Sequence, residues 1–530
     1  MRALPVTAGL LVAMLISPTI SAASNTDPPA DVVPTTMTLA GVLALHKTAI
    51  GSPKESPRTE TWLYSQGDLN GTQTILSSGD DYREDMVLGP FHTASGSYRG
   101  QRWRQDANGI TMLISGLHQR DDIDQQALEQ GKQGGGVSLL GETWAPMLAY
   151  VVKVDPPGGR VEYIFYDETS HLIVRTERAV ENRRVINTYD DFRMTDGTLR
   201  AWHAHESDGL PFNERDWKLQ AIDTSTPINA NVFAPPASDT THVTLNGSKI
   251  VLPGKIIADR VILIAQIGAH KVAFQLDSGA SQILLDKSVA DALRLPTFEK
   301  ETEITAGTYT ATQSIVPRIE FGGVTLKNMA IMTAPFQQWD DGATPVAGLL
   351  GFDFLATCVV HIDYLNGEAD ALDPKLFQPP PGAFALPILL DDAVPVVPVK
   401  IATVTSQNFI VDTGADRSIL FSSFVARHPD AVADQGLGEE FAEAFPFLND
   451  IVGVGGKINV THTQVSSITV GSAKFQHWLF SVVHDAPAFE GEDYDGLIGQ
   501  DVLRNFDVYL DYPHLMIYFL PNERYRERWG

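Results

Sequence analysis

Cysteine is almost absent from this sequence of 530 residues, because Cys358 is the only one. No disulfide can therefore form within the chain, and its domains must be stabilised by apolar cores. Cys358 lies in the run "ATCVVHIDY", which is typical of a buried strand. A reactive thiol needs exposure and a neighbouring base, so we do not expect this residue to be catalytic.

Positive charge is scarce as well. The 39 Lys and Arg residues are outnumbered by 65 Asp and Glu residues, which gives a formal net charge of −26. A chain of this sign repels phosphate backbones and anionic membrane surfaces. We therefore expect no nucleic acid partner.

No apolar run near the N-terminus is long enough to span a membrane. The largely apolar stretch from Ala8 to Ile16 follows Arg2 and precedes the small residues 21–23. That order is typical of a secretory signal, and the run is too short for a membrane helix. We expect residues 1–23 to be a signal peptide of an exported protein, periplasmic or secreted, since no cysteine follows to accept a lipid.

The remaining chain divides into segments that differ in composition and in their pattern of apolar and polar residues. The length suggests about three or four structural units. Residues 24–36 are a Pro/Thr/Asp linker, and residues 37–236 alternate apolar and polar residues between turn signals, which predicts an antiparallel, β-rich accessory domain. Its helices are expected at 122–132 and around Trp144–Val151. After the joint "APPASDTTH", nearly continuous apolar strands begin, and "DPKLFQPPPGA" divides them into 249–378 and 383–521.

Those two C-terminal segments are copies of one pattern. "FQLDSGASQIL" around Asp277 recurs as "FIVDTGADRSIL" around Asp412, at an offset of 412 − 277 = 135. Downstream, "GLLGFDFLATCVVHIDY" recurs as "GLIGQDVLRNFDVYLDY" at 499 − 351 = 148. A duplicated β-domain needs no shared acid, so an acid kept in the same place in both copies indicates a paired function.

Residues 249–521 resemble the aspartic peptidases of the pepsin and retroviral-protease superfamily, in the single-chain, two-lobed form. The resemblance lies in the two triplets and in the Leu-Leu-Gly and Leu-Ile-Gly elements that follow them: Asp277-Ser278-Gly279, Asp412-Thr413-Gly414, Leu349-Leu350-Gly351 and Leu497-Ile498-Gly499. It implies a mostly β chain with two pseudo-symmetric lobes of the closed-barrel type. It also implies an exported aspartic endopeptidase that works as a monomer, because both half-sites lie in one chain, and that uses no metal and no cofactor.

The chemistry of such a site needs two carboxyl groups close together. The pair then shares one proton, so that one acid activates a bound water while the other donates to the scissile carbonyl. Gly279 and Gly414 allow sharp turns beside the acids. The hydroxyl groups of Ser278 and Thr413 can bond across the lobe interface. Which aspartate, Asp277 or Asp412, carries the proton stays open.

A peptide or protein substrate in extended form needs a cover that excludes water. "VGVGGK", with Gly453, Gly455 and Gly456, is a good hairpin tip in the second lobe. Its counterpart is "TAGTYT", with Gly307 and with Tyr309 as a flap aromatic, so one flap or two could close.

The residue after each Gly-Ala differs between the copies, with Asp416 in the second lobe and Ser281 in the first. The resemblance implies that Asp416 contacts the substrate main chain. The alternative is a surface ion pair with Arg417 or Arg427. In either case the two half-sites should be unequal. The repeated acids Asp353 and Asp501 are expected to cap short helices.

The N-terminal unit, 37–236, resembles the lipoprotein-carrier half-barrel, in segments such as "YREDMVLGPFHTASGSYRGQRWRQDANG". The resemblance implies a concave face that binds an apolar ligand. Trp62, Trp103, Trp144 and Trp202 could line it or belong to an ordinary core. The pair in "HAHE" fits a wet sheet face as well as a metal site, so we assign no metal. The alternative function for the whole chain is a non-catalytic peptide- or lipid-binding protein of the cell envelope.

Overall fold

The computed structural model describes residues 28–29, 31–52, 56–114, 136–144, 147–155, 161–180, 183–304, 308–336, 345–391, 393–432, 450–453, 456–483 and 494–529. The chain forms two compact units. The first extends to Ser238 and includes Glu299–Thr302, and the second comprises Asp239–Phe298 and the residues from Glu303 onward. The expected signal peptide and part of the expected linker lie outside the described residues.

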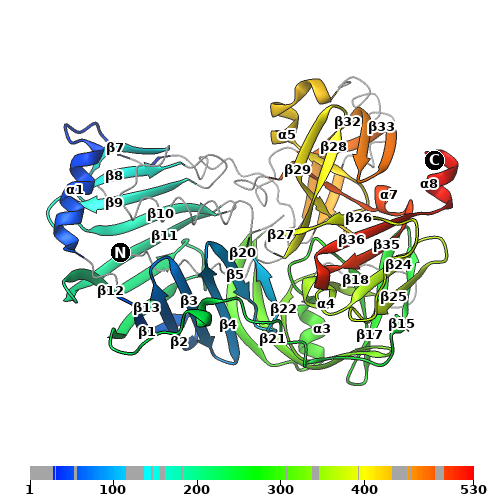
Figure 1. Ribbon diagram of the computed structural model, residues 1–530, viewed down its shortest axis with the longest axis horizontal. Helices are drawn as coiled ribbons and strands as arrows, with labels where there is room; N and C mark the ends of the chain where they lie inside the picture. The colour runs from blue at the N-terminus through cyan, green and yellow to red at the C-terminus, as the bar shows by residue number, and fades with distance from the viewer. Residues whose placement is uncertain are drawn as a thin grey trace. The chain divides into compact units, whose positions relative to one another are not determined.

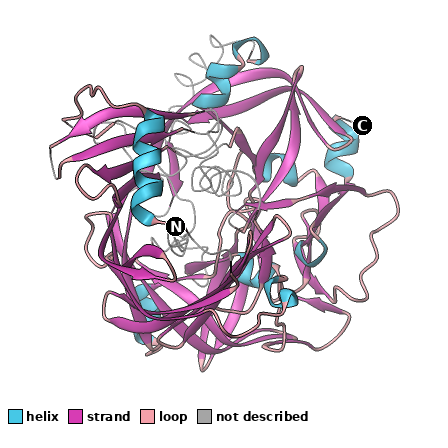
Figure 2. Cartoon of the chain, turned by 60° about the vertical axis from the view of Figure 1, so that its left-hand side comes forward, coloured by secondary structure: helices cyan, strands magenta, loops and turns pink. Residues whose placement is uncertain are grey.

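Strands make up most of the described chain, which confirms the prediction of a mostly β fold (Figure 2). In the first unit they form a single antiparallel sheet in the order β6-β5-β4-β3-β2-β1-β13-β12-β11-β10-β9-β8-β7 (Figure 1). The bounds in this unit are α1 Leu39–Ile50, β1 Arg58–Gln66, β2 Leu69–Ser78, β3 Asp81–Leu88, β4 Phe91–Tyr98, β5 Gln101–Gln105, β6 Thr111–Leu113, β7 Val137–Thr143, β8 Ala149–Val154, β9 Glu162–Asp167, β10 Ile173–Val180, β11 Arg183–Thr195, β12 Thr198–Ser207, β13 Arg215–Asp223 and the 3-10 helix η1 Ala230–Phe233.

Two local expectations for this unit need correction. The described residues of the segment Trp144–Val151, which are 144 and 147–151, are not helical, because β8 begins at Ala149 and pairs with β7 and β9 on its two sides. Pairing on both edges satisfies the backbone of "AYVVKV" and overrides the helical interpretation. Helix α1 was not expected, although Thr38 caps it by accepting from the Gly41 N–H and Gly51 ends it with φ of 82°.

The second unit contains sheets of nine, six and eight strands. Its first part has β14 Val243–Leu245, β15 Lys249–Val251, β16 Gly254–Ile257, β17 Arg260–Ile267, β18 His270–Leu276, β19 Leu284–Asp286, α3 Lys287–Ala292, β20 Thr297–Ile304, β21 Thr308–Phe321, β22 Val324–Ala334, β23 Val346–Leu350, α4 Phe352–Leu355, β24 Val359–Asp363 and β25 Glu368–Leu372.

Its second part repeats that order. It has β26 Phe384–Pro387, β27 Leu389–Asp391, β28 Val394–Ile401, β29 Val404–Val411, β30 Ile419–Phe421, α5 Ser422–Arg427, η2 Pro429–Ala431, β31 Asp450–Gly453, β32 Gly456–Val470, β33 Ala473–Val483, β34 Gly496–Ile498, α7 Gln500–Leu503, β35 Phe506–Asp511, η5 Tyr512–His514, β36 Met516–Pro521 and α8 Glu523–Arg528.

The internal repeat of the sequence is visible in the strand pairing. In the first copy β18 runs parallel to β23, and β23 is antiparallel to β19. In the second copy β29 runs parallel to β34, and β34 is antiparallel to β30. A sheet in the order β15-β25-β24-β35-β36-β26 joins strands from both copies. The two copies are therefore fixed to each other within one unit, with the loops after β18 and β29 in equivalent places.

Candidate active site

Asp277 and Asp412 each follow the last residue of a buried strand, β18 and β29 respectively. Their backbone N–H groups are held by the next strand over: Asp277 donates to the Leu350 carbonyl at 3.1 Å and Asp412 donates to the Ile498 carbonyl at 2.9 Å. The two side chains face each other closely enough that each perturbs the pKa of the other. The structure thus brings together two acids that lie 135 positions apart in the sequence.

The residues after the two acids cross-link the lobes. The Ser278 N–H donates to Thr413 Oγ1 and the Thr413 N–H donates to Ser278 Oγ, both at 2.9 Å. Each hydroxyl then donates onward, Ser278 to the Val411 carbonyl at 2.6 Å and Thr413 to the Leu276 carbonyl at 3.1 Å. Both side chains are fully buried. This closed set of four hydrogen bonds fixes the distance between the two loops.

The third residue of each triplet must be glycine for a steric reason. A Cβ on Gly414 would lie 2.5 Å from Asp277 Cγ and Oδ2, and a Cβ on Gly279 would lie 2.9 Å from Asp412 Cγ. Each glycine also donates its N–H to the acid of its own triplet, Gly279 to Asp277 Oδ1 at 2.9 Å and Gly414 to Asp412 Oδ1 at 2.7 Å. Each carboxyl therefore packs against the glycine of the opposite loop.

The two acids share an environment that disfavours ionisation. Burial raises the pKa of Asp277 well above its usual range, and the charge of Asp412 raises it further. Burial also raises the pKa of Asp412, but backbone N–H groups, that of Gly414 foremost, oppose this rise. Ala415 N–H is a second donor to Asp412 Oδ1, at 3.2 Å. Only 7% of Asp277 is exposed, whereas Asp412 is half-buried.

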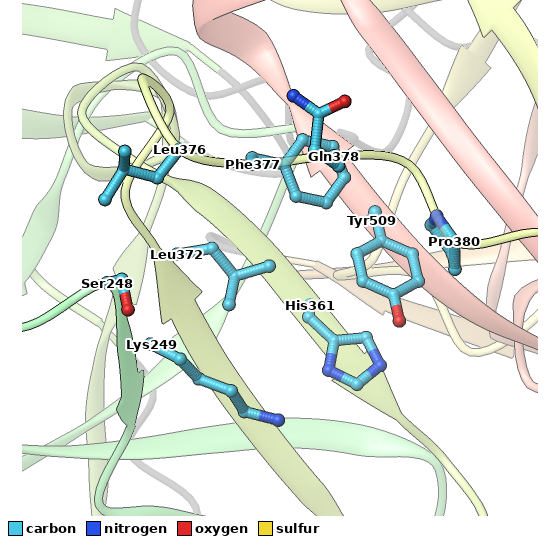
Figure 3. Close-up of a pocket in the computed structure, with 9 residues that line it drawn as sticks. All are labelled: Ser248, Lys249, His361, Leu372, Leu376, Phe377, Gln378, Pro380 and Tyr509. Carbon is cyan, nitrogen blue, oxygen red and sulfur yellow. The ribbon is translucent and has the colours of Figure 1, made fainter.

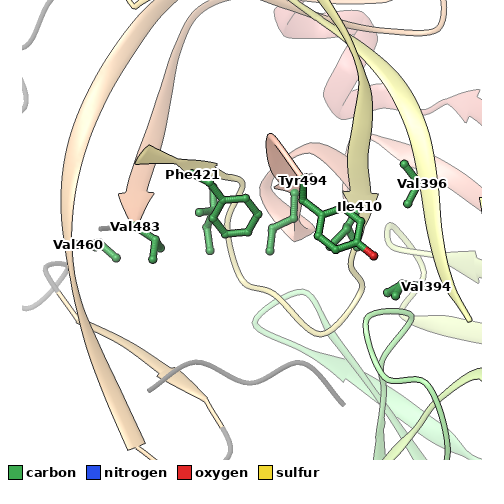
Figure 4. Close-up of a cluster of buried hydrophobic side chains, with 9 residues drawn as sticks. Val394, Val396, Ile410, Phe421, Val460, Val483 and Tyr494 are labelled. Atoms are coloured by element: carbon green, nitrogen blue, oxygen red, sulfur yellow. The ribbon is translucent and has the colours of Figure 1, made fainter. Parts of the chain in front are cut away.

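Apolar side chains surround the dyad on both sides. In the second lobe, Ala415 packs against a buried cluster drawn from β28, β29, β30, β32, β33 and β34, with Tyr494 next to them (Figure 4). In the first lobe, the equivalent Ala280 belongs to a cluster with Leu284, Met332 and Leu349. These side chains lower the local dielectric constant, which strengthens every electrostatic interaction of the acids.

Each lobe also supplies a hairpin where the sequence predicted a flap. In the first lobe β20 and β21 are neighbours in the sheet, and Tyr309 on β21 packs against the cluster that contains Ala280. In the second lobe β31 and β32 pair, with Gly453 opposite Gly456. The tip residues Gly307 and Gly455 lie outside the described residues.

Asp416 forms an ion pair, but with a partner other than those expected. Arg260 on β17 donates its Nε to Asp416 Oδ1 at 2.5 Å and its second terminal nitrogen to Asp416 Oδ2. Arg427 instead binds Asp495. The pair joins the two lobes, and the first lobe has no copy of it, because Ser281 and Pro395 stand at the equivalent positions.

Two other expectations concern the repeated acids of the short helices. Asp353 and Asp501 are not the residues that precede α4 and α7, since glycine occupies both of those positions. Asp353 instead accepts from the Ile283 N–H at 2.7 Å, and Asp501 accepts from the N–H and the hydroxyl of Ser418. They hold the chain that follows each dyad acid.

Sequence reasoning missed two glutamines beside the dyad. Gln500, the first residue of α7, donates its side-chain amide to the Thr413 carbonyl at 2.6 Å. Gln275, on β18, donates its side-chain amide to the Gly414 carbonyl at 2.9 Å. Alignment of the two copies could have found them, because it places an apolar residue opposite each glutamine: Phe352 opposite Gln500 (500 − 148) and Ile410 opposite Gln275 (275 + 135).

The remaining candidates lie away from the dyad. His203 of the "HAHE" segment bonds to Asp190 and Asp216, and within the described ranges no group of three or more His, Cys, Asp or Glu side chains could hold a metal ion. Trp103 is fully buried and Trp62 nearly so, whereas Trp144 is 67% exposed. No helix among the described residues is long and apolar enough to cross a membrane.

A cavity of about 310 Å³ lies elsewhere in the second unit, between β15, β24, β35 and the segment around Phe377 (Figure 3). None of the dyad residues lines it. Its charged groups are already paired, since Lys249 and His361 both bind the buried carboxylate of Asp370. The ring of His361 stacks on Tyr509 at a centroid distance of 4.3 Å.

Comparison with known proteins gives one match of sequence. Residues 263–354 match the family model described as "Aspartyl protease". No curated protein matches the chain. The matched segment includes Asp277 and the element that ends at Gly351, and it stops before the second copy.

Solved structures give more distant likenesses. The aspartic proteinase from Irpex lacteus is 14% identical, with 52% of this chain and 98% of that chain covered and a TM-score of 0.33. A LolA superfamily protein from Nitrosomonas europaea is 14% identical, with 38% of this chain and 98% of that chain covered and a TM-score of 0.28. Both scores are too low to carry an argument, so the function must be argued from the geometry of the site. The sequence comparison thus shows that residues 263–354 are similar to the aspartyl protease family, as the first triplet had predicted.

Proposed function

We propose that this protein is an aspartic endopeptidase that hydrolyses peptide bonds with a water molecule activated by Asp277 and Asp412. One observation carries the proposal: the two acids come from equivalent loops of a duplicated unit, and the carboxyl group of each packs against the glycine of the opposite triplet in an apolar environment. A structural turn needs no such pairing, because burying two carboxyl groups side by side costs free energy that only a function explains.

The pair holds one proton over a range of pH, since the two groups cannot both ionise cheaply. Asp412 receives hydrogen bonds from the backbone of Gly414, Ala415 and Gly279, and these favour its ionised form. Asp277 is more deeply buried and receives fewer such bonds. In the free enzyme Asp277 therefore keeps the proton, and Asp412 is the base.

The reaction then follows from these protonation states. Asp412 removes a proton from the water as its oxygen attacks the scissile carbonyl carbon, while Asp277 donates its proton to the carbonyl oxygen. A gem-diol results, and the proton now on Asp412 passes to the leaving nitrogen as the C–N bond breaks. Asp277 regains a proton from the gem-diol as the carboxyl product forms, and Asp412 is again ionised.

The substrate fits as an extended peptide. Hairpins β20–β21 and β31–β32 belong to the lobes on either side of the dyad, and apolar clusters flank each acid. An extended chain can add main-chain hydrogen bonds to a hairpin while its apolar side chains enter the surrounding clusters. We also propose that the protein is exported, from the order of charge, apolar and small residues in 1–23, and that the first unit binds an apolar ligand.

The direct test is a digest of a peptide library by the purified protein at acidic and neutral pH. Asp277→Asn and Asp412→Asn should each abolish cleavage and leave the circular dichroism spectrum unchanged. A matched control is Asp430→Asn, which changes an exposed aspartate of the second lobe. Cleavage by either dyad variant at the wild-type rate would refute the mechanism. Peptide binding without any cleavage by the wild type would support the non-catalytic alternative.

A further inference from the structure

We infer that Gln275 and Gln500 are positioning residues that place the negative charge of the dyad on Asp412 and the proton on Asp277. The inference rests on the proposed function and concerns the same site. Neither glutamine touches a carboxyl group. Each acts on a peptide group whose N–H does, and no glutamine stands at the equivalent positions of the other half of the duplicated unit.

Asp412 Oδ1 accepts hydrogen bonds from two backbone N–H groups, those of Gly414 and Ala415. The N–H of Gly414 belongs to the peptide group whose carbonyl is that of Thr413, and this carbonyl accepts from Gln500 Nε2 at 2.6 Å. The N–H of Ala415 belongs to the peptide group whose carbonyl is that of Gly414, and this carbonyl accepts from Gln275 Nε2 at 2.9 Å. Each of these two peptide groups is therefore hydrogen-bonded both at its carbonyl oxygen, by a glutamine, and at its N–H, by Asp412.

A hydrogen bond to a carbonyl oxygen polarises its peptide group and makes the N–H of that group a stronger donor. The effect is larger where the dielectric constant is low, and both glutamines are buried, Gln500 at 1% and Gln275 at 7% exposure. A stronger N–H donor stabilises an ionised carboxylate more than a neutral carboxyl group. The two glutamines therefore favour ionisation of Asp412.

The first lobe lacks this arrangement although its backbone is equivalent. The position of Gln500 is taken by Phe352, and the position of Gln275 relative to the other loop is taken by Ile410. Neither side chain can donate a hydrogen bond. Among the residues that the structure describes, the side-chain donor to the Ser278 carbonyl is the Tyr512 hydroxyl, at the longer distance of 3.5 Å. The Gly279 N–H also lies at 2.9 Å from Asp277, compared with 2.7 Å for Gly414 and Asp412.

Other charged groups do not account for the difference. Among the described residues, the titratable groups that face Asp412 are Asp277 and, from the turn after β35, Tyr512. Tyr512 faces both acids, and burial together with their charges raises its pKa well above the usual range, so it stays neutral. The ion pair of Arg260 with Asp416 is exposed and internally neutralised.

The test replaces each glutamine by methionine, which keeps the length of the side chain and removes its donor. In a profile of kcat/KM against pH, the acid limb reports the first ionisation of the pair and the alkaline limb the second. Without the glutamines the anion on Asp412 is less stable, so the acid limb should move to higher pH by about half a unit to one unit in Gln275→Met/Gln500→Met. The alkaline limb, which reports loss of the proton from Asp277, should not move.

The matched control is Phe352→Leu, which alters the equivalent position in the first lobe without changing any donor. It should leave both limbs in place. If one glutamine variant fails to fold, the other tests the inference alone, because the two residues bind different carbonyl groups. An acid limb that stays at the wild-type pH in the double variant, or that moves equally in Phe352→Leu, overturns the inference.

A second readout does not depend on activity. The carboxyl carbons of the two aspartates, labelled with ¹³C and assigned with Asp277→Asn and Asp412→Asn, can be titrated directly by NMR. Asp412 should ionise first in the wild type, and its titration should shift upward in the double variant. Titration of Asp277 first overturns the inference even if the protein cuts peptides. The expected order supports it even if no peptide is cut, in which case only the proposed reaction fails.

Discussion

The sharpest steric prediction concerns the glycines of the two triplets. Replacing Gly414 by alanine places a Cβ 2.5 Å from Asp277 Cγ and Oδ2, whereas the same change at Gly279 places it 2.9 Å from Asp412 Cγ. Real carbon atoms do not approach a carboxyl group to 2.5 Å, so Asp277 must move in Gly414→Ala by roughly half an ångström to an ångström. Asp277 cannot move freely, because the Gly279 N–H and the other acid hold it.

A displacement of this size is large for catalysis. Moving a reacting group by about 1 Å can cost on the order of 100-fold in rate. We therefore expect Gly414→Ala to lose about 100-fold in kcat/KM, and Gly279→Ala about tenfold. Overpacking should also lower the free energy of unfolding by about 1–3 kcal/mol in the former and by less in the latter.

The assay is cleavage of the best library peptide, with thermal melts of both variants to separate misfolding from misplacement. Gly279→Ala is the matched control, because it makes the same chemical change on the same type of loop. Activity of Gly414→Ala within twofold of the wild type, or a larger loss in Gly279→Ala than in Gly414→Ala, would refute the steric reasoning.

Three further predictions concern stability. Thr413→Val leaves the buried Ser278 N–H without the Thr413 acceptor and should lower the free energy of unfolding by about 2–4 kcal/mol in denaturant titrations. Thr413→Ser keeps the acceptor and should lower this free energy little. Equal losses in the two variants would contradict the cross-link. Because the pKa of Asp277 is raised in the folded state, its contribution to stability is present below about pH 4 and is lost as the pH rises through the folded pKa. The free energy of unfolding of Asp277→Asn should therefore exceed that of the wild type at pH 7 but not at pH 4. A difference that does not change with pH would contradict the raised pKa. Burial raises the pKa of Glu84 from 4.5 to about 7, so the ionised form of this side chain destabilises the folded state. Glu84→Gln should therefore raise the free energy of unfolding of the first unit at pH 8 by about 3 kcal/mol. Glu214→Gln, which changes an exposed residue, should have no effect.

Much of the candidate site could be predicted from the sequence, because its central chemistry is local and repeated. Each acid lies in one short motif, and the offset between the motifs shows that the two loops are equivalent. The β class of both units followed from alternation and from nearly continuous apolar runs. Each of these patterns involves residues within about ten positions of one another. Such local patterns can be recognised without knowing which distant segments are in contact.

What the sequence did not predict depends on contacts between distant segments. Arg260 reaches Asp416 across 156 positions, and no local pattern distinguishes it from Arg417, which is adjacent to Asp416 in the chain. Residues Ala149–Val151, which we expected to be helical, belong to a strand because two other strands pair with them. Helix α1 had a cap at Thr38 and a glycine at its end, and was missed because its apolar residues are spread around the helix and show no clear helical periodicity.

The two glutamines show why duplication within one chain matters for an acid pair. Two identical chains related by a twofold axis give the two acids identical surroundings, so the proton has no preferred side until a substrate binds. Once both halves belong to one chain, substitutions can accumulate in one half alone. Gln275 and Gln500 stand opposite Ile410 and Phe352, and Asp416 stands opposite Ser281. All three differences fall within two residues of the triplets that form the site, and the two glutamine differences act on the acid of the second copy. Fusing the halves therefore allows the acid and the base to be assigned before the peptide arrives, and the pH profile of the double glutamine variant measures that assignment.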